Sequence, residues 1–148
     1  MSEQNMKNVR RLLEEVWTQG NLALLPEVMA HDSLCYPMPQ FDAVRGCDEY
    51  MAFIAVYKGT FLDMSFKIED QFAAGDKVAT RWVTHVTDPS GEVEQQSAVG
   101  EQLSIDGITI THHNSEGKIV AEWATWDTQS LLQSAEAPRI FEQLSIGV

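Results

Sequence analysis

Apolar residues near the start of the chain recur with the period of an α-helix. Five of them, spaced at i, i+3, i+4, i+7 and i+8, form one helical face: Val9, Leu12, Leu13, Val16 and Trp17. Gly20 provides a left-handed stop after them. Proline is tolerated only in a first helical turn, so a second, short helix is expected to begin near Pro26 and to end before His31. A further apolar stripe predicts a third helix over residues 46–59.

Beyond residue 63 the period changes to two, which is typical of β-strands. The alternation predicts four strands, separated by turns rich in Gly, Asp and Ser: residues 64–69, 78–86, 99–110 and 119–126. In the third of them the apolar phase slips by one at Asp106-Gly107, and we interpret this slip as a β-bulge. Helices followed by strands indicate an α+β fold, with three N-terminal helices stacked on a curved antiparallel sheet. Residues 1–133 are expected to form this domain, and residues 134–148 an extension that packs on the body or on a partner chain.

Composition excludes several classes of partner. The 148 residues hold 22 acids and 10 bases, a formal charge of −12, which repels nucleic acid and anionic lipid headgroups. The first residues lack the apolar core of a signal peptide, and no apolar run reaches the roughly 20 residues that span a bilayer. We therefore expect a cytoplasmic protein that does not bind membranes. Cys35 and Cys47 form no C-x-x-C pair and have no nearby His at ligand spacing, so neither a disulfide framework nor a metal site is expected.

Four stretches together resemble the SnoaL-like polyketide cyclase branch of the nuclear-transport-factor-2-like superfamily. In chain order they are N-V-R-R-L-L-E-E-V-W-T-Q-G-N-L, R-G-C-D-E-Y-M-A-F with F-L-D-M-S-F-K-I-E-D, G-D-K-V-A-T-R-W, and D-G-I-T-I-T-H-H-N-S-E-G-K-I-V-A-E-W-A-T-W-D-T-Q-S-L-L-Q. The resemblance covers roughly residues 5 to 133. It implies a cone-shaped α+β barrel with a pocket between helices and sheet, a homodimer packed through the outer sheet face, and no cofactor.

The catalytic acids that the resemblance implies are absent from this sequence. Cyclases of this branch have an Asp directly after the Trp of the last strand, and here that position is Ala124. The related limonene-epoxide hydrolases have acids at the positions of Val83 and Ala124, beside an Arg that matches Arg81. Steroid-isomerase relatives have acids near Tyr36 and Thr109. None of these four positions holds a carboxylate.

Two other acids near the lost site are candidates for catalysis. Glu122 alternates in phase with Ala124 and Trp126, a set that the resemblance directs into the cone. Its carboxylate would lie about 6–7 Å from the lost site and could move protons, or it could be a solvated strand residue. Asp127 could serve as a catalytic acid or as the N-cap of the segment T-Q-S-L-L-Q.

Arg81 and His85 are two further candidates, and they share one face of the predicted strand over residues 78–86. By the same resemblance this face of the second strand is expected to point into the cone. Arg81 could pair with a carboxylate or hold an anionic or carbonyl group of a ligand. His85 could act as a base or as a hydrogen-bond donor, or be a structural histidine. Trp82, which alternates with them, is then expected on the outer face, within the dimer contact.

Two functions of different classes remain open. One is a cofactor-free cyclase, isomerase or hydrolase that acts by proton transfer on a small apolar or polyketide-like molecule, with Glu122, His85, Asp127 and Arg81 as catalytic candidates. The other is a non-catalytic protein that binds such a molecule. In either case eight residues are expected to line the pocket: Trp17, Tyr36, Met38, Tyr57, Val83, Thr109, Ala124 and Trp126.

Overall fold

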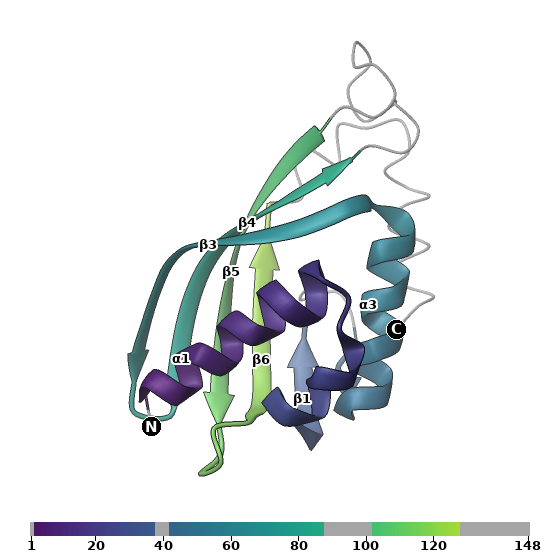
Figure 1. The fold of residues 1–148 in the computed structure, drawn as a ribbon. Helices are drawn as coiled ribbons and strands as arrows, with labels where there is room; N and C mark the ends of the chain where they lie inside the picture. Colours follow the sequence, from purple (N-terminus) through teal and green to yellow (C-terminus); the bar gives the residue numbers. More distant parts are fainter. Residues whose placement is uncertain (1, 38–41, 88–101, 128–148) are drawn as a thin grey trace.

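The computed structural model describes residues 2–37, 42–87 and 102–127, and the statements below concern these residues. They form three α-helices on one six-stranded sheet, with a π-helical and a 3-10 segment between the first two helices (Figure 1). The helical segments are α1 (Ser2–Arg11), η1 (Leu12–Thr18), η2 (Leu22–Leu24), α2 (Leu25–Val28) and α3 (Gly46–Thr60). The strands are β1 (Met29–Tyr36), β2 (Val44–Arg45), β3 (Leu62–Ala74), β4 (Lys77–Thr87), β5 (Gln102–His113) and β6 (Ile119–Trp126).

The helices follow the predicted apolar stripes. All five residues of the first stripe are buried, although the helix changes from α to π geometry at Leu12. Gly20 has the predicted left-handed backbone, with φ of 76°. At the start of α3 Gly46 also has a positive φ, 71°, and a Cβ there would lie 2.7 Å from the carbonyl oxygen of His31. Only glycine therefore fits the junction between β2 and α3.

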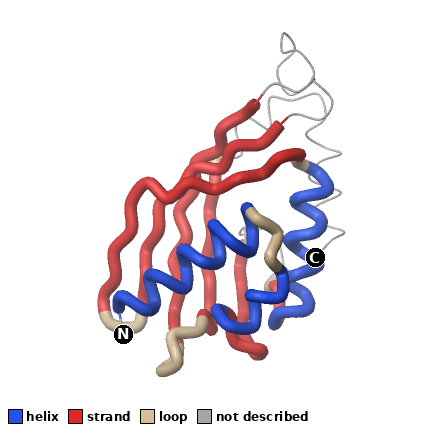
Figure 2. The backbone as a smooth tube through the Cα atoms, viewed as in Figure 1, coloured by secondary structure: helices blue, strands red, loops and turns tan. Residues whose placement is uncertain are grey.

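The six strands form a mixed sheet that is not closed, in the order β2-β1-β6-β5-β4-β3. Four neighbouring pairs are antiparallel, and β1 runs parallel to β6. Both α1 and α3 lie against the same face of this curved sheet, so helices and strands form two layers (Figures 1 and 2). The α+β class and the helix-on-sheet arrangement are confirmed, and the parallel β1–β6 pair is the one departure from an antiparallel sheet.

The predicted β-bulge at Asp106-Gly107 is wrong. Strands β4 and β5 pair without a register shift from Lys77 opposite His112 to Thr87 opposite Gln102. The apolar phase slips because Ile108 and Ile110 are exposed apolar residues, 48% and 43% accessible, and not because the backbone bulges. Pattern alone cannot distinguish an exposed isoleucine from a shifted strand.

A buried polar network joins α1 to the hairpin between β5 and β6. Asn8 Nδ2 donates to the carbonyl oxygen of Gly117 at 2.8 Å, and His113 Nδ1 lies 2.8 Å from the same oxygen. Because a carbonyl only accepts, Nδ1 carries the hydrogen, and Nε2 accepts from the Thr111 hydroxyl at 2.8 Å. Burial lowers the pKa of His113, which keeps the ring neutral. His113 is therefore a structural histidine.

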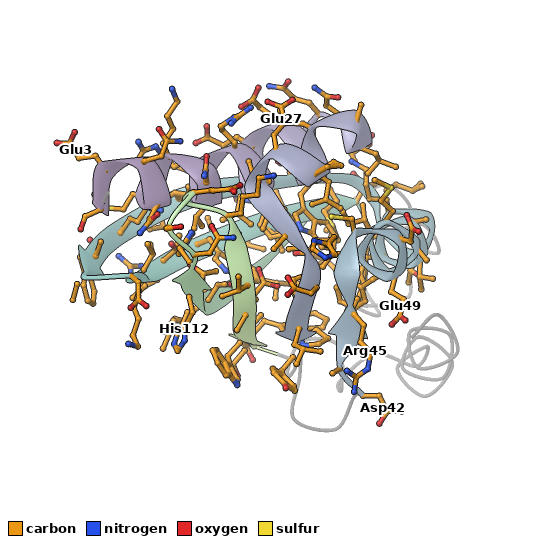
Figure 3. The ribbon with its side chains drawn as sticks, turned by 90° about the horizontal axis from the view of Figure 1, so that it is seen from below. Glu3, Glu27, Asp42, Arg45, Glu49 and His112 are labelled. Carbon is orange, nitrogen blue, oxygen red and sulfur yellow. The ribbon has the colours of Figure 1, made fainter. Side chains whose placement is uncertain are left out.

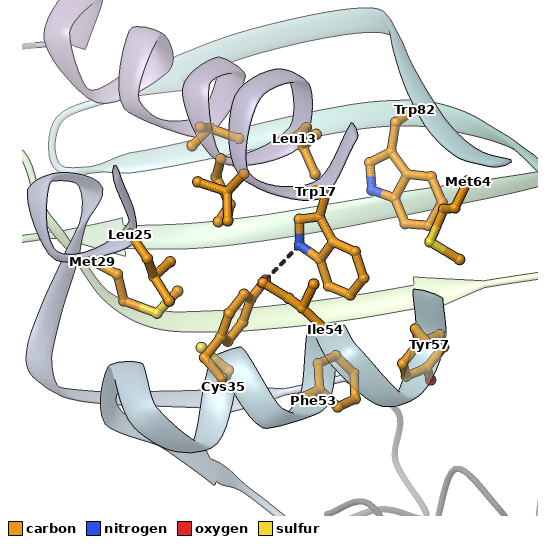
Figure 4. Packing of buried hydrophobic residues seen from close by; sticks show 14 of the residues in the cluster. Leu13, Trp17, Leu25, Met29, Cys35, Phe53, Ile54, Tyr57, Met64 and Trp82 are labelled. Atoms are coloured by element: carbon orange, nitrogen blue, oxygen red, sulfur yellow. Dashed lines mark hydrogen bonds between the residues drawn. The ribbon is translucent and has the colours of Figure 1, made fainter. Parts of the chain in front are cut away.

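Polar and apolar side chains are separated in the usual way. The charged residues Glu3, Glu27 and Glu49 lie at the periphery of the molecule, away from the layer between helices and sheet (Figure 3). That layer holds a cluster of buried apolar residues around Trp17 (Figure 4). No helix within the described ranges is long and apolar enough to span a bilayer.

Candidate functional site

A cavity opens within the layer between helices and sheet. The volume open to the centre of a water-sized sphere is about 70 Å³, and all the empty space in and around the cavity, open solvent included, is about 600 Å³. Segment η1 contributes Leu13 and Trp17 to its wall, and α3 contributes three aromatic residues one or two helical turns apart: Tyr50, Phe53 and Tyr57. The sheet provides the opposite wall. Half of the residues that line the cavity are aromatic, so its surface is almost wholly apolar.

One carboxyl group, that of Glu122 on β6, lies in this apolar wall. Its residue is only 5% exposed. The Tyr50 hydroxyl donates a hydrogen bond to Glu122 Oε1 at 3.3 Å, and Trp17 Nε1 in turn donates to the Tyr50 oxygen at 3.1 Å (Figure 4 shows the second bond). Three elements, η1, α3 and β6, thus meet in one chain of hydrogen bonds that fixes the position of the carboxyl group.

Burial raises the pKa of Glu122 from about 4.5 to about 7, and the Tyr50 hydrogen bond offsets only part of that rise. No ion pair within the described ranges involves Glu122. Its titratable neighbours stay neutral, because burial also raises the pKa values of Tyr50 and Cys35, the latter being the residue opposite Glu122 on β1. Glu122 therefore exchanges a proton near neutral pH, as a general acid or base requires.

Other polar groups in the wall are mostly satisfied. Trp82 Nε1 donates to Thr109 Oγ1 at 2.8 Å, which holds the indole against the sheet. Tyr57 is the exception: it lines the cavity, and its buried hydroxyl has no hydrogen-bond partner within the described residues. A buried hydroxyl without a hydrogen bond costs free energy, and a polar group of a ligand could supply the missing hydrogen bond.

The structure places the residues expected to line the pocket in three groups. Five lie in the cavity wall: Trp17, Tyr57, Thr109, Ala124 and Trp126. Tyr36 instead stacks on Trp123 on the far face of the sheet, with ring centroids 5.6 Å apart, and Val83 also lies on that face because it alternates with Trp82. Met38 lies outside the described residues, as does the predicted extension of residues 134–148.

The predicted orientation of β4 is wrong. Trp82 is 6% exposed and lines the cavity, so Arg81 and His85 lie on the outer face. Arg81 is exposed, and His85 Nδ1 lies 3.0 Å from Ser104 Oγ in an exposed pair. The error arose because the orientation was taken from the family resemblance; the alternation itself sets Val78, Trp82 and Val86 on the face opposite Arg81 and His85.

Asp127 lies just beyond β6 and is exposed, and its backbone N–H donates to the Asp106 carbonyl at 2.8 Å. The helix that its side chain was expected to cap falls outside the described residues. Tyr50 is the site residue that sequence reasoning missed. Tyr50 belongs to the apolar stripe that predicted the third helix. A tyrosine on a buried stripe needs a hydrogen-bond partner for its hydroxyl, and this requirement could have identified Tyr50 as a site residue.

Comparisons with known proteins agree with this geometry. The family model for SnoaL-like polyketide cyclases matches residues 7–135. Among solved structures, a protein assigned as a SnoaL-like polyketide cyclase from Jannaschia sp. CCS1 is 21% identical, with 93% of this chain and 94% of that chain covered and a TM-score of 0.77. IdmH, assigned as a polyketide cyclase from Streptomyces antibioticus, is 24% identical over 88% and 97% of the two chains, with a TM-score of 0.73. AclR from Streptomyces galilaeus, assigned as a hydroxylase, is 18% identical over 96% and 98%, with a TM-score of 0.70.

At these identities the solved structures show the shared fold alone. No curated protein matches the chain. The described residues contain no group of three His, Cys, Asp or Glu side chains that could hold a metal ion. The match over residues 7–135 spans most of the 148-residue chain, and the chain therefore belongs to the SnoaL-like polyketide cyclase family.

Proposed function

We propose that the protein is a cofactor-independent acid/base enzyme, of the cyclase or isomerase type, in which Glu122 transfers protons. The observation that supports this is a lone carboxyl group with a pKa of about 7 in an aromatic cavity. A group that is near half ionised at neutral pH can take a proton from a substrate carbon or hydroxyl and return it elsewhere. Tyr50 keeps the carboxyl group in place during both steps.

The position of Glu122 supports the same role. Glu122 and Ala124 both line the cavity, and the resemblance places the Asp of the family's cyclases at the position of Ala124. Side chains two apart on a strand lie about 6–7 Å from each other on one face. The longer Glu side chain, one step back, can therefore serve the same region of the cavity.

The substrate that suits the wall is small and apolar, with a carbonyl or hydroxyl group for Glu122 and Tyr57. Eight aromatic side chains favour a flat, ring-containing body. The polyketide cyclase assignments of IdmH and the Jannaschia protein fit such a molecule. Arg81, once expected to hold the substrate, lies on the other face and has no part in this proposal.

Proton exchange on a model ketone tests the proposal. We expect the wild-type protein to speed hydrogen–deuterium exchange at C1 of 2-tetralone in D2O, followed by proton NMR, at least tenfold over the Glu122→Gln variant. The matched control is Glu116→Gln, which removes an exposed carboxylate and should leave the rate unchanged. Equal rates in wild type and Glu122→Gln would disprove the catalytic role.

A second function, non-catalytic binding, is favoured by one observation: Ala124 stands where the resemblance places the Asp of the family's cyclases. It predicts that 2-tetralone binds equally well to the wild-type protein and to Glu122→Gln, while neither protein speeds its exchange. The two functions therefore differ in a single measured rate.

We also propose that two copies of the chain pair through the outer face of the sheet. An apolar row crosses that face over five strands, with each member opposite the next in register: Phe72, Ala79, Ile110, Trp123 and Tyr36. Three of these residues are large and exposed, with Phe72 at 66% and Ile110 and Trp123 at 43% each. Contiguous exposed apolar surface of this kind is typical of an interface between proteins.

A further inference from the structure

The wall of the cavity contains an acidic side chain and no basic one. Among its lining residues Glu122 is the single ionisable acid, and none is Lys, Arg or His. The strand that could have supplied a cation turns Arg81 and His85 to the other face. An ionised Glu122 would therefore stand in the wall with no counter-charge from the described part of the chain, an arrangement that is costly unless a bound group supplies one.

The rest of the wall favours positive charge as well. Aromatic rings carry negative potential on their faces and attract cations, with tryptophan the strongest. Three of the rings in this wall are those of Trp17, Trp82 and Trp126. The whole chain has a formal charge of −12, which raises the local concentration of cations and lowers that of anions.

We infer that the cavity binds an apolar molecule carrying one protonated amine, whose ammonium group donates hydrogen bonds to Glu122 while aromatic rings enclose its body. This inference rests on the cavity and carboxyl group of the proposed function but not on turnover. In this complex Glu122 is held ionised, so an amine of this kind should also block proton transfer by Glu122.

The affinity should depend on pH in a defined direction. The titratable groups around Glu122 are Tyr50 on α3 and Cys35 on β1, and both stay neutral through the neutral range because burial raises their pKa values. Of these three groups only Glu122 changes charge between pH 5 and 8, and the amine remains protonated there. Amine affinity should rise as pH increases toward about 7 and then level off, since only the ionised carboxylate forms the ion pair.

Three matched compounds test the inference: 2-naphthylmethylamine, 2-naphthylmethanol and 2-naphthoate, titrated into the full chain by isothermal calorimetry at pH 8. We expect the amine to bind at least tenfold more tightly than the alcohol, and the carboxylate at least tenfold more weakly. In Glu122→Gln the alcohol should bind as before, because the cavity persists, while the advantage of the amine should disappear. The exposed-site variant Glu116→Gln should keep that advantage.

Several results would overturn the inference: equal affinity of amine and alcohol in the wild-type protein, tighter binding of the carboxylate, survival of the amine preference in Glu122→Gln, or no binding of any of the three. The exchange of 2-tetralone is a separate measurement. If exchange depends on Glu122 and the amine does not bind, this inference alone fails. If the amine binds and no exchange occurs, the acid/base function alone fails.

Discussion

At the scale of single residues, Glu122 should make stability depend on pH. Its pKa rises from about 4.5 to about 7 on folding, so the folded chain holds a proton that the unfolded chain releases in that range. This contribution to stability is fully present below pH 4.5 and is lost as pH rises through 7. A rise of this size corresponds to about 3 kcal/mol. Glutamine does not titrate, so the Glu122→Gln variant does not lose this contribution. Between pH 5 and 8 its free energy of unfolding should therefore rise by about 2–3 kcal/mol relative to that of wild type.

Urea unfolding at pH 5 and at pH 8 measures the free energy of unfolding of both proteins and so this difference. Other carboxyl groups also titrate near pH 5, so the comparison is made against Glu116→Gln, an exposed carboxylate in the β5–β6 hairpin that should follow wild type at both pH values. A constant difference between Glu122→Gln and wild type from pH 5 to 8 would show that Glu122 is solvated in the folded chain.

The family resemblance placed Glu122 on the correct face of β6 and Arg81 on the wrong face of β4. On β6 the alternation sets Glu122, Ala124 and Trp126 on one face, and the family resemblance indicated that this face points into the cavity, as it does. On β4 the alternation sets Val78, Trp82 and Val86 on the face opposite Arg81 and His85, which favours the observed orientation, but the resemblance directed the polar set into the cone. Packing settles the orientation: the Trp82 indole lies between the layers, against the Phe66 ring.

At the scale of elements, Gly107 on β5 is explained by Trp82 and not by a bulge. The two residues lie opposite each other in the β4–β5 ladder. A Cβ at position 107 would lie 2.3 Å from the Trp82 ring, so the indole packs against β5 at this point only because glycine leaves room for it. From there Trp82 donates its hydrogen bond to Thr109, two residues along the same strand.

Gly107→Ala should therefore move Trp82 toward the cavity. We expect a loss of about 1–3 kcal/mol in the free energy of unfolding, the usual cost of overpacking, together with weaker binding of 2-tetralone because the ring takes up its space. The matched control is Gly59→Ala in α3, where a Cβ meets nothing within 4 Å. That change should stabilise the helix by about 0.5–1 kcal/mol. Equal stability of the two variants would contradict the role of Gly107.

Strand β1 and the π-helical segment η1 were not predicted, for separate reasons. Strand β1 begins with two buried and two exposed residues and alternates only over its last four, and its partner β6 lies far along the sequence, so no local signal marked it. The π-helical segment η1 keeps the apolar stripe of an α-helix, because Leu12, Leu13, Val16 and Trp17 are buried in either geometry. Hydrophobic periodicity fixed which side chains point inward but not the hydrogen-bond spacing beneath them.

At the scale of the whole molecule, the outer face of the sheet explains the exposed apolar residues that misled the strand analysis. Ile110 is one of the two isoleucines that broke the apolar phase of β5. It lies opposite Trp123 on one side and Ala79 on the other, at the centre of the row that crosses five strands. His112 packs against the same tryptophan, with ring centroids 4.8 Å apart. A monomer would leave this row in water.

Ile110→Lys tests the proposed dimer at the centre of that row. A lysine there would bring two like charges together across the two-fold axis and bury them in an apolar contact, which costs several times the loss of one apolar side chain. We expect wild type to be a dimer at micromolar concentration by light scattering after gel filtration, and the variant to be a monomer with unchanged circular dichroism. Leu62→Lys, at a residue that is 47% exposed and lies outside the row, should stay dimeric. A monomeric wild type, or a dimeric Ile110→Lys variant, would show that the outer face of the sheet is not a dimer interface.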